Sequence, residues 1–293
     1  LLTELRATEE ADDLQASAVA VLRDNLYGLE IDERCAQLAA FALALRVWTL
    51  PRAAGHVELP DLNVACVGLA PQTAKADWKD LARGDTRAAN SLEDLHDMFS
   101  AAPILGSLIS PRHQPNSLLT ETFENVEYML RCAMAAEGPP NVDDHERRVT
   151  AAGLSRAASL LADHYHLVVT NPPYLGLGAM SDDLAAHVRG EFDVAKRELA
   201  LCMTARISQL VRPCGTMALV LPGEWTYARA YRAFRSQFLA HHSVHTLVRL
   251  GPNAFSSGVR ANPVLIVASA GATTAGAIAT FDVMKESVEE KGQ

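Results

Sequence analysis

The chain has 293 residues, 49% of them hydrophobic, and a formal net charge of −9 at pH 7. This supplies enough apolar side chains for one large domain or two small ones. The negative balance excludes a global basic field for nucleic-acid binding, so an anionic partner would have to meet a local basic surface. No apolar run approaches the roughly 20 residues that a membrane span needs, which excludes a membrane partner.

The cysteines are widely scattered, with no Cys-x-x-C pair. They are Cys35, Cys66, Cys132, Cys202 and Cys214. This usage predicts neither a zinc site nor a disulfide framework, and it is typical of a reducing cytoplasm. His241, His242 and His245 form the one histidine cluster that invites a metal hypothesis. On an otherwise basic segment we interpret them as solvated or phosphate-facing side chains, so we expect no metal.

The N-terminal part of the sequence alternates between helical and strand-like segments. Apolar residues at helical spacing predict a helix over Leu1–Leu22. A strand is expected over Asn25–Ile31, and an alanine-rich amphipathic helix follows over Glu33–Trp48. A second strand is expected over Asn63–Leu69. A strand followed directly by a helix is a βα unit.

Two acidic residues, Glu30 and Asp32, lie where the first strand ends. An acid at that point can accept hydrogen bonds from both hydroxyls of a ribose, as in nucleotide-binding doubly wound sheets. Because side chains alternate across a strand, one of the two should face the ligand crevice and the other should face outward. Many strands end in an acid, so this feature gains weight only in combination with others.

Residues 50–150 are expected to form a helical insertion that covers one edge of the sheet, because this excursion is long for a βα connection. Residues 71–97 are polar and helical, and a short apolar segment follows at Ile104–Ile109. A further helix is predicted over Asn116–Ala136.

The C-terminal part continues the alternation. A helix over Ala151–His164 leads into the strand described below, and helices follow over Ser181–Arg189 and Asp193–Leu210. Further strands are expected at Thr216–Leu221, Val244–Leu250 and Pro263–Ala268. Strands that alternate with helices predict one α/β domain over residues 1–293, with a largely parallel sheet.

The segment that organises the sequence is a strand around Leu167–Val169 that runs into Asn171, Pro172, Pro173 and Tyr174. The continuous apolar run suits a strand buried on both faces. Two prolines cannot extend a central strand, but they fix the backbone stiffly. Asn171 and Tyr174 would therefore be held at the carboxyl end of a strand, where open α/β sheets bind ligands. The alternative interpretation is a strand that merely ends in a Pro-Pro turn.

This residue set suits methyl transfer to an amine attached to an aromatic ring. The lone pair of such an amine is delocalised into the ring, so the nitrogen is a poor nucleophile. An Asn side-chain oxygen and a proline carbonyl are non-ionising acceptors that can take both amino hydrogens and localise the lone pair. A neighbouring tyrosine ring can stack on a flipped-out base, a contact worth about 1–3 kcal/mol. Asn171, Pro172 and Tyr174 supply this set within four residues.

The sequence resembles class I S-adenosylmethionine-dependent methyltransferases with an Asn-Pro-Pro-Tyr motif that are specific for adenine in DNA. It is most similar to the large adenine methylases of type IIG restriction–modification and of the phage-growth-limitation (BREX) defence systems. Five segments carry this resemblance in the family's order. They are residues 25–43, 62–71, 95–109, 165–176 and 215–227.

The resemblance implies a Rossmann-like doubly wound, mostly parallel α/β sheet and S-adenosyl-L-methionine as the cofactor. It implies that Glu30 binds the cofactor ribose, with Asp32 beside it, and that Ile31 flanks the cofactor adenine, with Ser107 and Leu108 nearby. The four residues from Asn171 to Tyr174 would hold a target adenine flipped out of double-stranded DNA. Other subunits of a defence system are possible partners.

Two departures from the family pattern stand out. No glycine-rich methionine-binding loop occurs in these residues. In the family that loop lies on the first, central strand of the sheet, so the chain lacks both, and we expect it not to bind the cofactor tightly by itself. Relatives also often carry Lys-x-Asp-Leu after the motif, where this chain has Lys196, Arg197, Glu198 and Leu199.

A basic segment follows the motif: between Trp225 and Phe281 there are arginines but no acidic residue. Arg229, Arg232 and Arg235, spaced at i, i+3 and i+6, are candidates for DNA phosphate contacts, and a solvated helix face fits them equally well. Asn-Pro-Pro-Tyr also occurs in methylases of RNA and of protein glutamine, so those substrates remain alternatives. A third hypothesis is an inactive methylase-like piece that binds DNA or serves as a scaffold.

Overall fold

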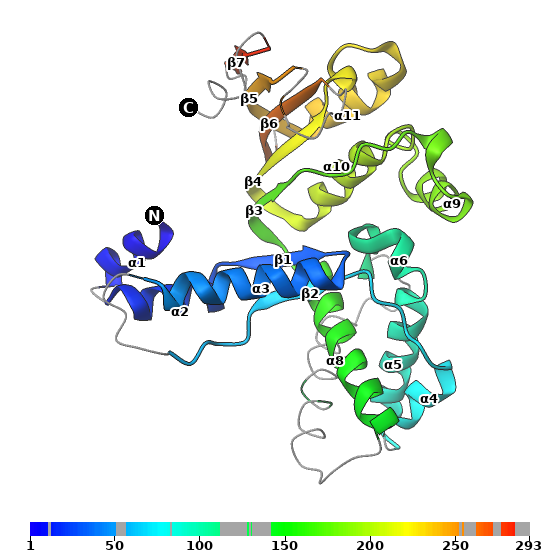
Figure 1. The fold of residues 1–293 in the computed structure, drawn as a ribbon. Coiled ribbons are helices and arrows are strands. Elements are labelled where there is room, and N and C mark those ends of the chain that lie inside the picture. The colour runs from blue at the N-terminus through cyan, green and yellow to red at the C-terminus, as the bar shows by residue number, and fades with distance from the viewer. Residues whose placement is uncertain are drawn as a thin grey trace. The chain divides into compact units, whose positions relative to one another are not determined.

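The computed structural model describes residues 1–10, 13–50, 57–82, 84–111, 128, 130, 142–251, 254, 262–271 and 277–284. The chain forms two compact units, Leu1–Ala162 and Asp163–Gln293, which are described separately. Both contain helices and strands, which confirms the α/β class (Figure 1).

The first unit contains one parallel pair of strands, β1 (Tyr27–Glu30) and β2 (Asn63–Cys66), in register from Tyr27 opposite Asn63 to Glu30 opposite Cys66. Its helices are α1 (Leu2–Glu10), α2 (Leu14–Asp24), α3 (Glu33–Trp48), α4 (Lys75–Asp80), α5 (Thr86–Phe99), α6 (Ala102–Leu105), the 3₁₀ turn η1 (Gly106–Leu108) and α8 (Val142–Ala162).

Aspartate caps define several of these helix starts. Asp13, Asp32 and Asp85 each accept hydrogen bonds from two backbone N–H groups of the first turn of α2, α3 and α5 respectively. The predicted single helix over Leu1–Leu22 is therefore wrong, because the cap at Asp13 starts a new helix. The predicted helix over Asn116–Ala136 lies largely outside the described residues.

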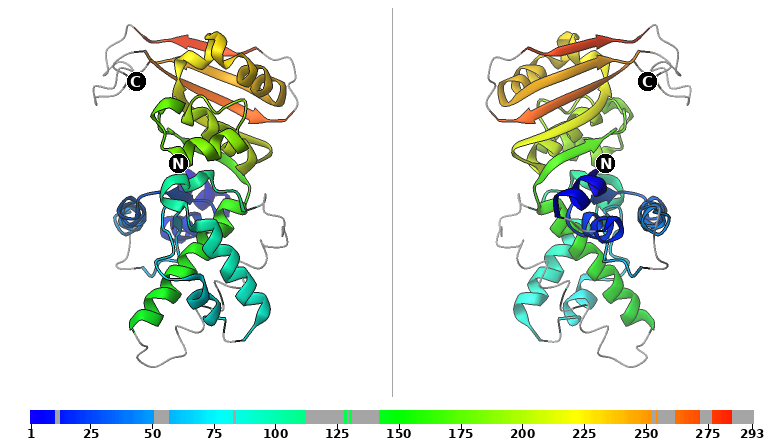
Figure 2. Two further views of the ribbon diagram at one scale, coloured as in Figure 1. Left: turned by 90° about the vertical axis from the view of Figure 1, so that its right-hand side faces the viewer. Right: turned by 90° about the vertical axis from the view of Figure 1, so that its left-hand side faces the viewer.

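The core of the first unit lies where α5 and α8 pack against each other, two helices that cross in the views of Figure 2. Its largest fully buried side chains include Trp78, Leu92, Phe99, Leu154 and Leu161. Their burial removes large apolar side chains from water, each contributing roughly 1.5–3 kcal/mol. Helices dominate the described residues 75–108 and 142–162, and α8 starts at Val142, earlier than the predicted helix over Ala151–His164.

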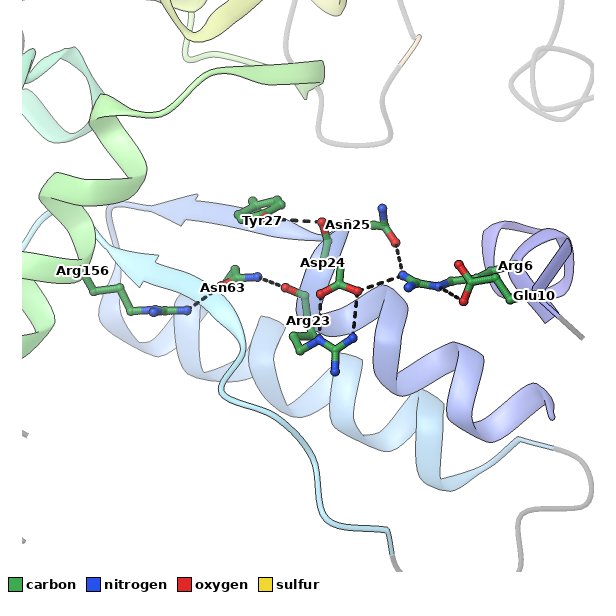
Figure 3. Close-up of polar contacts among 8 residues, drawn as sticks. All are labelled: Arg6, Glu10, Arg23, Asp24, Asn25, Tyr27, Asn63 and Arg156. Atoms are coloured by element: carbon green, nitrogen blue, oxygen red, sulfur yellow. Dashed lines mark hydrogen bonds and ion pairs between the residues drawn. The ribbon is translucent and has the colours of Figure 1, made fainter. Parts of the chain in front are cut away.

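A polar network holds the amino ends of β1 and β2 (Figure 3). The carboxylate of Asp24 accepts contacts from Arg6 at 3.1 Å and Arg23 at 2.7 Å. Asn63 donates to the Arg23 carbonyl at 2.7 Å, and Arg156 of α8 donates to the Asn63 side chain at 2.6 Å. These contacts connect α1, α2, β2 and α8 next to the point where β1 begins at Tyr27.

The second unit contains a five-stranded sheet in the order β3-β4-β6-β5-β7. Its strands are β3 (Tyr165–Thr170), β4 (Val211–Pro222), β5 (His242–Arg249), β6 (Pro263–Ala270) and β7 (Ala279–Asp282). Its helices are α9 (Asp182–Glu191), α10 (Leu199–Leu210) and α11 (Arg232–His241), with 3₁₀ turns η3 (Leu177–Ala179), η4 (Gly223–Thr226) and η5 (Arg229–Tyr231).

The sheet is mixed, which corrects the expectation of a largely parallel sheet. β3 pairs parallel with β4, and β5 pairs parallel with β7, but β6 is antiparallel to both β4 and β5. β3, β4, β5 and β7 therefore point one way and β6 alone is reversed. The reversal arises because α11 returns the chain from β4 to a parallel β5, and β6 then runs back between them.

The faces of β3 also differ from the expectation. Leu167 is 58% exposed and Val169 is 68% exposed, so β3 is not buried on both faces. β3 is an edge strand whose one partner in the sheet is β4. An apolar run indicates a strand, but it does not reveal how many neighbours that strand has.

Candidate functional site

The Asn-Pro-Pro-Tyr segment lies at the carboxyl end of β3, as predicted, because β3 ends at Thr170. Asn171 and Pro173 are exposed, Pro172 is buried and Tyr174 is half-buried. The buried proline fixes the turn against the unit, and the asparagine before it faces solvent. A polar side chain with that exposure is free to bind a ligand.

The turn is held from behind by a segment that we expected to be helical. The Leu199 N–H donates to the Leu175 carbonyl at 2.9 Å, and the Leu177 N–H donates to the Arg197 carbonyl at 3.0 Å. Gly176 forms an antiparallel bridge with Glu198. Because this pairing requires extended backbone, α10 begins at Leu199 and not at Asp193. The α9 start was correct: Ser181 caps it by accepting from Leu184 N–H.

The hydroxyl of Tyr174 is buried and has no hydrogen-bond partner among the described residues. Burial raises the pKa of Tyr174 to about 12, and the nearby carboxylates of Glu198 and Glu224 add to the effect. The phenol is therefore neutral at any physiological pH. A neutral aromatic ring is what stacking on a base requires.

The neighbouring strand β4 ends beside this turn, since β3 and β4 are parallel and Thr170 is opposite Leu219. The turn after β4 is built closely around Gly223, where a Cβ atom would lie 2.5 Å from the Asn262 carbonyl oxygen. Exposed Glu224 and buried Trp225 follow. The Glu224 carboxylate helps to raise the pKa of Tyr174, and nothing but its place after a strand could have pointed to it in the sequence.

The predicted arginines differ in their surroundings. Arg235 is half-buried, and its Nη1 donates to the carbonyls of Trp225 at 2.6 Å and Ala228 at 3.3 Å. Arg229 and Arg232 are exposed. Arg235 thus supports the turn after β4, which leaves Arg229 and Arg232 as the better candidates for phosphate contacts.

The predicted cofactor residues lie in the first unit, at the carboxyl end of β1. Oε1 of half-buried Glu30 accepts hydrogen bonds from Ile31 N–H at 2.8 Å and Asp32 N–H at 3.1 Å. Asp32 is occupied differently, because its Oδ1 accepts from Arg34 N–H at 2.8 Å and caps α3. Each acid uses only one of its oxygens in these bonds; the difference is that Asp32 caps α3 and Glu30 does not.

Ile31 lies between two glycines that come from distant parts of the sequence. A Cβ atom on Gly68 would lie 2.0 Å from the Ile31 carbonyl oxygen, and one on Gly106 would lie 2.9 Å from Ile31 Cδ1. Ser107 and Leu108 follow Gly106 in η1, so the structure brings their segment to the end of β1. Leu108 is 2% exposed and packs in the interior, whereas Ser107 is half-exposed and Ile31 is exposed.

These residues fit an adenosine-containing cofactor in part. Glu30 has the carboxylate that ribose hydroxyls need, and exposed Ile31 has the apolar surface that an adenine ring needs. The described residues contain no group of three or more potential metal ligands. Cys35, Cys66, Cys202 and Cys214 are free thiols, and Cys132 lies outside the described residues.

A cavity of about 320 Å³ lies elsewhere in the first unit. It is lined by Gln72, Thr73, Asp77, Trp78, Glu146, Arg147 and Thr150, none of which belongs to the predicted site. A smaller cavity of about 60 Å³ adjoins Gly223 and Thr226 at the end of β4. The strand ends carry the chemistry, so we place the site there and not in the larger cavity. In the part of the chain that the structure describes, no helix is both long and apolar enough to cross a membrane.

Comparison with known proteins gives an independent view of the same residues. Residues 24–255 match the model of the family described as Eco57I restriction-modification methylase. The chain is 27% identical over 267 residues to the adenine-specific methyltransferase BrxX of Escherichia coli O9:H4 (strain HS), a match that covers 80% of this chain and 21% of that protein. It is 26% identical over 239 residues to the adenine-specific methyltransferase PglX of Lacticaseibacillus casei (strain Zhang), covering 82% of this chain and 19% of that protein.

The chain therefore spans about a fifth of the length of these curated relatives. Among solved structures it is similar to a putative class I S-adenosylmethionine-dependent methyltransferase from Listeria monocytogenes, with a TM-score of 0.34 and 12% identity over 96% of this chain and 89% of that one. The family match includes the ends of β1 and β3, where the predicted site residues lie.

Proposed function

Because the chain belongs to the Eco57I restriction-modification methylase family, we propose that it supplies catalytic residues for transferring a methyl group from S-adenosylmethionine to the exocyclic amine of adenine in DNA. Membership of this family confirms the resemblance to adenine methylases of restriction and phage-defence systems that the motifs indicated. The site residues, the mechanism and the partners of this chain are the content of the proposal.

The observation that carries the proposal is the exposed Asn171 at the end of β3, followed by a proline that is buried and therefore fixed. In the proposed mechanism the Asn171 side-chain oxygen and the Pro172 carbonyl each accept one amino hydrogen of the target adenine. This localises the nitrogen lone pair. Pro173 stiffens the turn, so both acceptors keep their geometry as the amine attacks.

Tyr174 holds the target base by stacking. Its ring is half-buried and its hydroxyl is neutral, so the exposed part of the ring is an apolar surface for a flipped-out adenine. Flipping costs a few kcal/mol of stacking and pairing energy, which ring stacking offsets in part. No strong base is needed, since the methylated nitrogen is acidic and releases its proton to solvent.

When bound, the cofactor supplies the methyl group. Glu30 would accept hydrogen bonds from its ribose hydroxyls, Ile31 would pack on its adenine, and Ser107 would lie beside it with Leu108 packed behind. Asp32 would serve this site indirectly, by starting α3. No glycine-rich loop occurs in the 293 residues, so we assign no residue of this chain to the methionine end.

We further propose double-stranded DNA as the macromolecular partner, with Arg229 and Arg232 as phosphate contacts, and activity within a restriction or phage-defence system that includes other subunits. We also propose that residues 1–293 belong to one catalytic domain, in which residues 50–150 are a helical insertion. BrxX and PglX are both described as adenine-specific methyltransferases, which supports adenine as the substrate here.

A substrate panel tests this function. The native protein that carries this chain is incubated with methyl-labelled donor and, separately, with duplex DNA, RNA and bacterial protein. Mass spectrometry of digested DNA should detect N6-methyladenine that depends on the protein. Labelling of RNA or of protein glutamine with none in DNA would overturn the proposal and favour the alternatives that share the same motif. No labelling of any substrate would favour the scaffold hypothesis.

A further inference from the structure

A carboxylate that the proposed mechanism does not use lies directly behind the Asn-Pro-Pro-Tyr turn. Oε1 of Glu198 accepts a hydrogen bond from the Leu175 N–H at 2.6 Å, and this contact is half-buried. Leu175 is the residue after Tyr174. Glu198 is 24 residues after Tyr174 in the sequence, so the contact is tertiary and not part of a local turn.

The side-chain bond completes a short ladder. Leu175 also accepts a backbone hydrogen bond from Leu199 at 2.9 Å, and Leu177 donates to the Arg197 carbonyl at 3.0 Å. Both polar backbone groups of Leu175 are therefore bonded to one segment: its carbonyl to the backbone and its N–H to the Glu198 carboxylate. Removing the carboxylate would leave the half-buried N–H without an acceptor from that segment.

The segment is held by the buried start of α10. Glu198 stands at the N-cap position of α10. Ala200, Leu201 and Cys202, the next residues of that helix, are fully buried. The Cys202 thiol donates to the Ala195 carbonyl at 3.4 Å, which ties the preceding turn to the same helix. Because Glu198 is held at the start of α10, its bond to the Leu175 N–H also holds the backbone next to Tyr174.

Several ionisable groups face Glu198. Tyr174 is on the turn, Glu224 is in η4, Tyr231 is in η5, and Arg197 is its neighbour in the chain. Burial raises the pKa of Glu198, and the charge of Glu224 raises it further, while the backbone bond to Leu175 acts in the opposite direction. Half-burying a carboxylate near another carboxylate is costly, and here the hydrogen bond from the Leu175 N–H offsets part of that cost.

We propose that Glu198 is a positioning residue: by holding the Leu175 N–H it orients Tyr174, and so sets the orientation of the target base without touching it. This inference rests on the proposed function, because it assigns Tyr174 the stacking role. It extends that function by placing the control of base orientation on a residue outside the motif.

The test uses the native protein that carries this chain and duplex DNA with 2-aminopurine at the target adenine, whose fluorescence reports on stacking of the flipped base. Glu198→Ala is compared with Glu191→Ala, which removes an exposed carboxylate at the end of α9. We expect Glu198→Ala to lower kcat about tenfold to a hundredfold, since a misplacement of about 1 Å costs on the order of a hundredfold. The 2-aminopurine signal should change, KM for the methyl donor should stay within about twofold, and Glu191→Ala should match the wild type.

Glu198→Gln keeps an oxygen acceptor and removes the charge. It should retain kcat within about threefold and the wild-type 2-aminopurine signal, because its side-chain oxygen can still accept from the Leu175 N–H. If Glu198→Ala does not fold, the kcat of Glu198→Gln still tests the positioning role. A loss of kcat of more than about tenfold in a folded Glu198→Gln, or wild-type kcat and 2-aminopurine signal in a folded Glu198→Ala, would overturn the positioning role.

The two proposals fail in distinguishable ways. If the wild-type protein methylates DNA and Glu198→Ala behaves like the wild type, the positioning role is wrong and the function stands. If the wild-type protein methylates another amine, the DNA function is wrong. The kcat comparison of the variants on that amine then tests Glu198 directly.

Discussion

Gly106 lies against the side chain of Ile31, so closely that a Cβ atom at Gly106 would be 2.9 Å from Ile31 Cδ1. The backbone of Gly106 also has φ of +50°, in the region that favours glycine. Residues 75 positions apart in the sequence thus meet at the end of β1. This contact brings η1 to the residues proposed to hold the cofactor.

Gly106→Ala should destabilise the chain by about 1–2 kcal/mol, because it adds backbone strain and displaces Ile31. It should also weaken donor binding by the native protein. Thermal unfolding of the chain and calorimetry with the donor measure the two effects. Gly153→Ala is the matched control: Gly153 lies inside α8 with nothing within 4 Å of an added Cβ, and there alanine should stabilise by about 0.5–1 kcal/mol. Equal effects of the two substitutions would contradict the packing described at Ile31.

The two acids at the end of β1 should respond differently to substitution. Asp32→Ala removes the cap of α3 and should cost about 0.5–2 kcal/mol of stability. Glu30→Ala removes the acceptor of two exposed backbone N–H groups and should cost up to about 1.5 kcal/mol of stability, and it should weaken donor binding about tenfold to a hundredfold, the loss expected for a hydrogen bond to a charged group. Unfolding and donor titration are measured on both variants of the native protein. If Asp32→Ala weakened donor binding more than Glu30→Ala, the assignment of the two acids would be reversed.

Arg235 and Arg232 should differ in their roles: substitution of Arg235 should affect stability, and substitution of Arg232 should affect DNA binding. Arg235→Ala leaves the Trp225 carbonyl without its charged donor and should destabilise by about 1–3 kcal/mol. Arg232→Ala should not change stability, but it should reduce the salt dependence of DNA binding by about one phosphate contact. Thermal unfolding and binding at several salt concentrations test the pair. An unchanged salt slope in Arg232→Ala would indicate that this arginine is only part of a solvated helix face.

The chain should lose stability in acid through half-buried His187 and buried His242. Burial lowers the pKa of His187 and of His242, whose Nδ1 donates to the Phe238 carbonyl at 2.9 Å. Below about pH 6.5 the unfolded chain takes up protons that these folded imidazoles resist, so the free energy of unfolding falls as the pH falls. His187→Leu should make this decline shallower, since the His187 Nε2 is buried without a partner in the described structure. The exposed His241→Gln should not, and an equally steep decline in both variants would rule out the linkage.

The sequence predicted the strands and helices well where the hydrophobic pattern and the turn or helix-cap residues mark the same boundaries. Every strand from β1 to β6 overlaps a predicted one, because each is a short apolar run bounded by turn residues. β7 was missed, since Ala279–Asp282 is a short and fully exposed edge strand with no alternation to detect. The resemblance placed Ile31 and Ser107 at a common site, and the structure brings their segments together through Gly106.

Tertiary contacts explain what the sequence could not indicate. The start of α10 at Leu199 depends on the pairing of Glu198 with Gly176, which helical periodicity does not contain. The role of Arg235 depends on a carbonyl ten residues earlier that the turn after β4 exposes to it. The exposure of Val169 depends on the place of β3 at the edge of its sheet.

The most direct test of the proposed chemistry is the rate of N6-methyladenine formation by the native protein with Asn171→Ala. Asn90→Ala, which removes an exposed asparagine from α5, is the control. Removing the acceptor that localises the lone pair should lower kcat on the order of a hundredfold to a thousandfold, as loss of a preorganised transition-state contact does. The control should keep the wild-type rate. Wild-type methylation of adenine by Asn171→Ala would contradict the assignment of the Asn-Pro-Pro-Tyr turn as the catalytic centre.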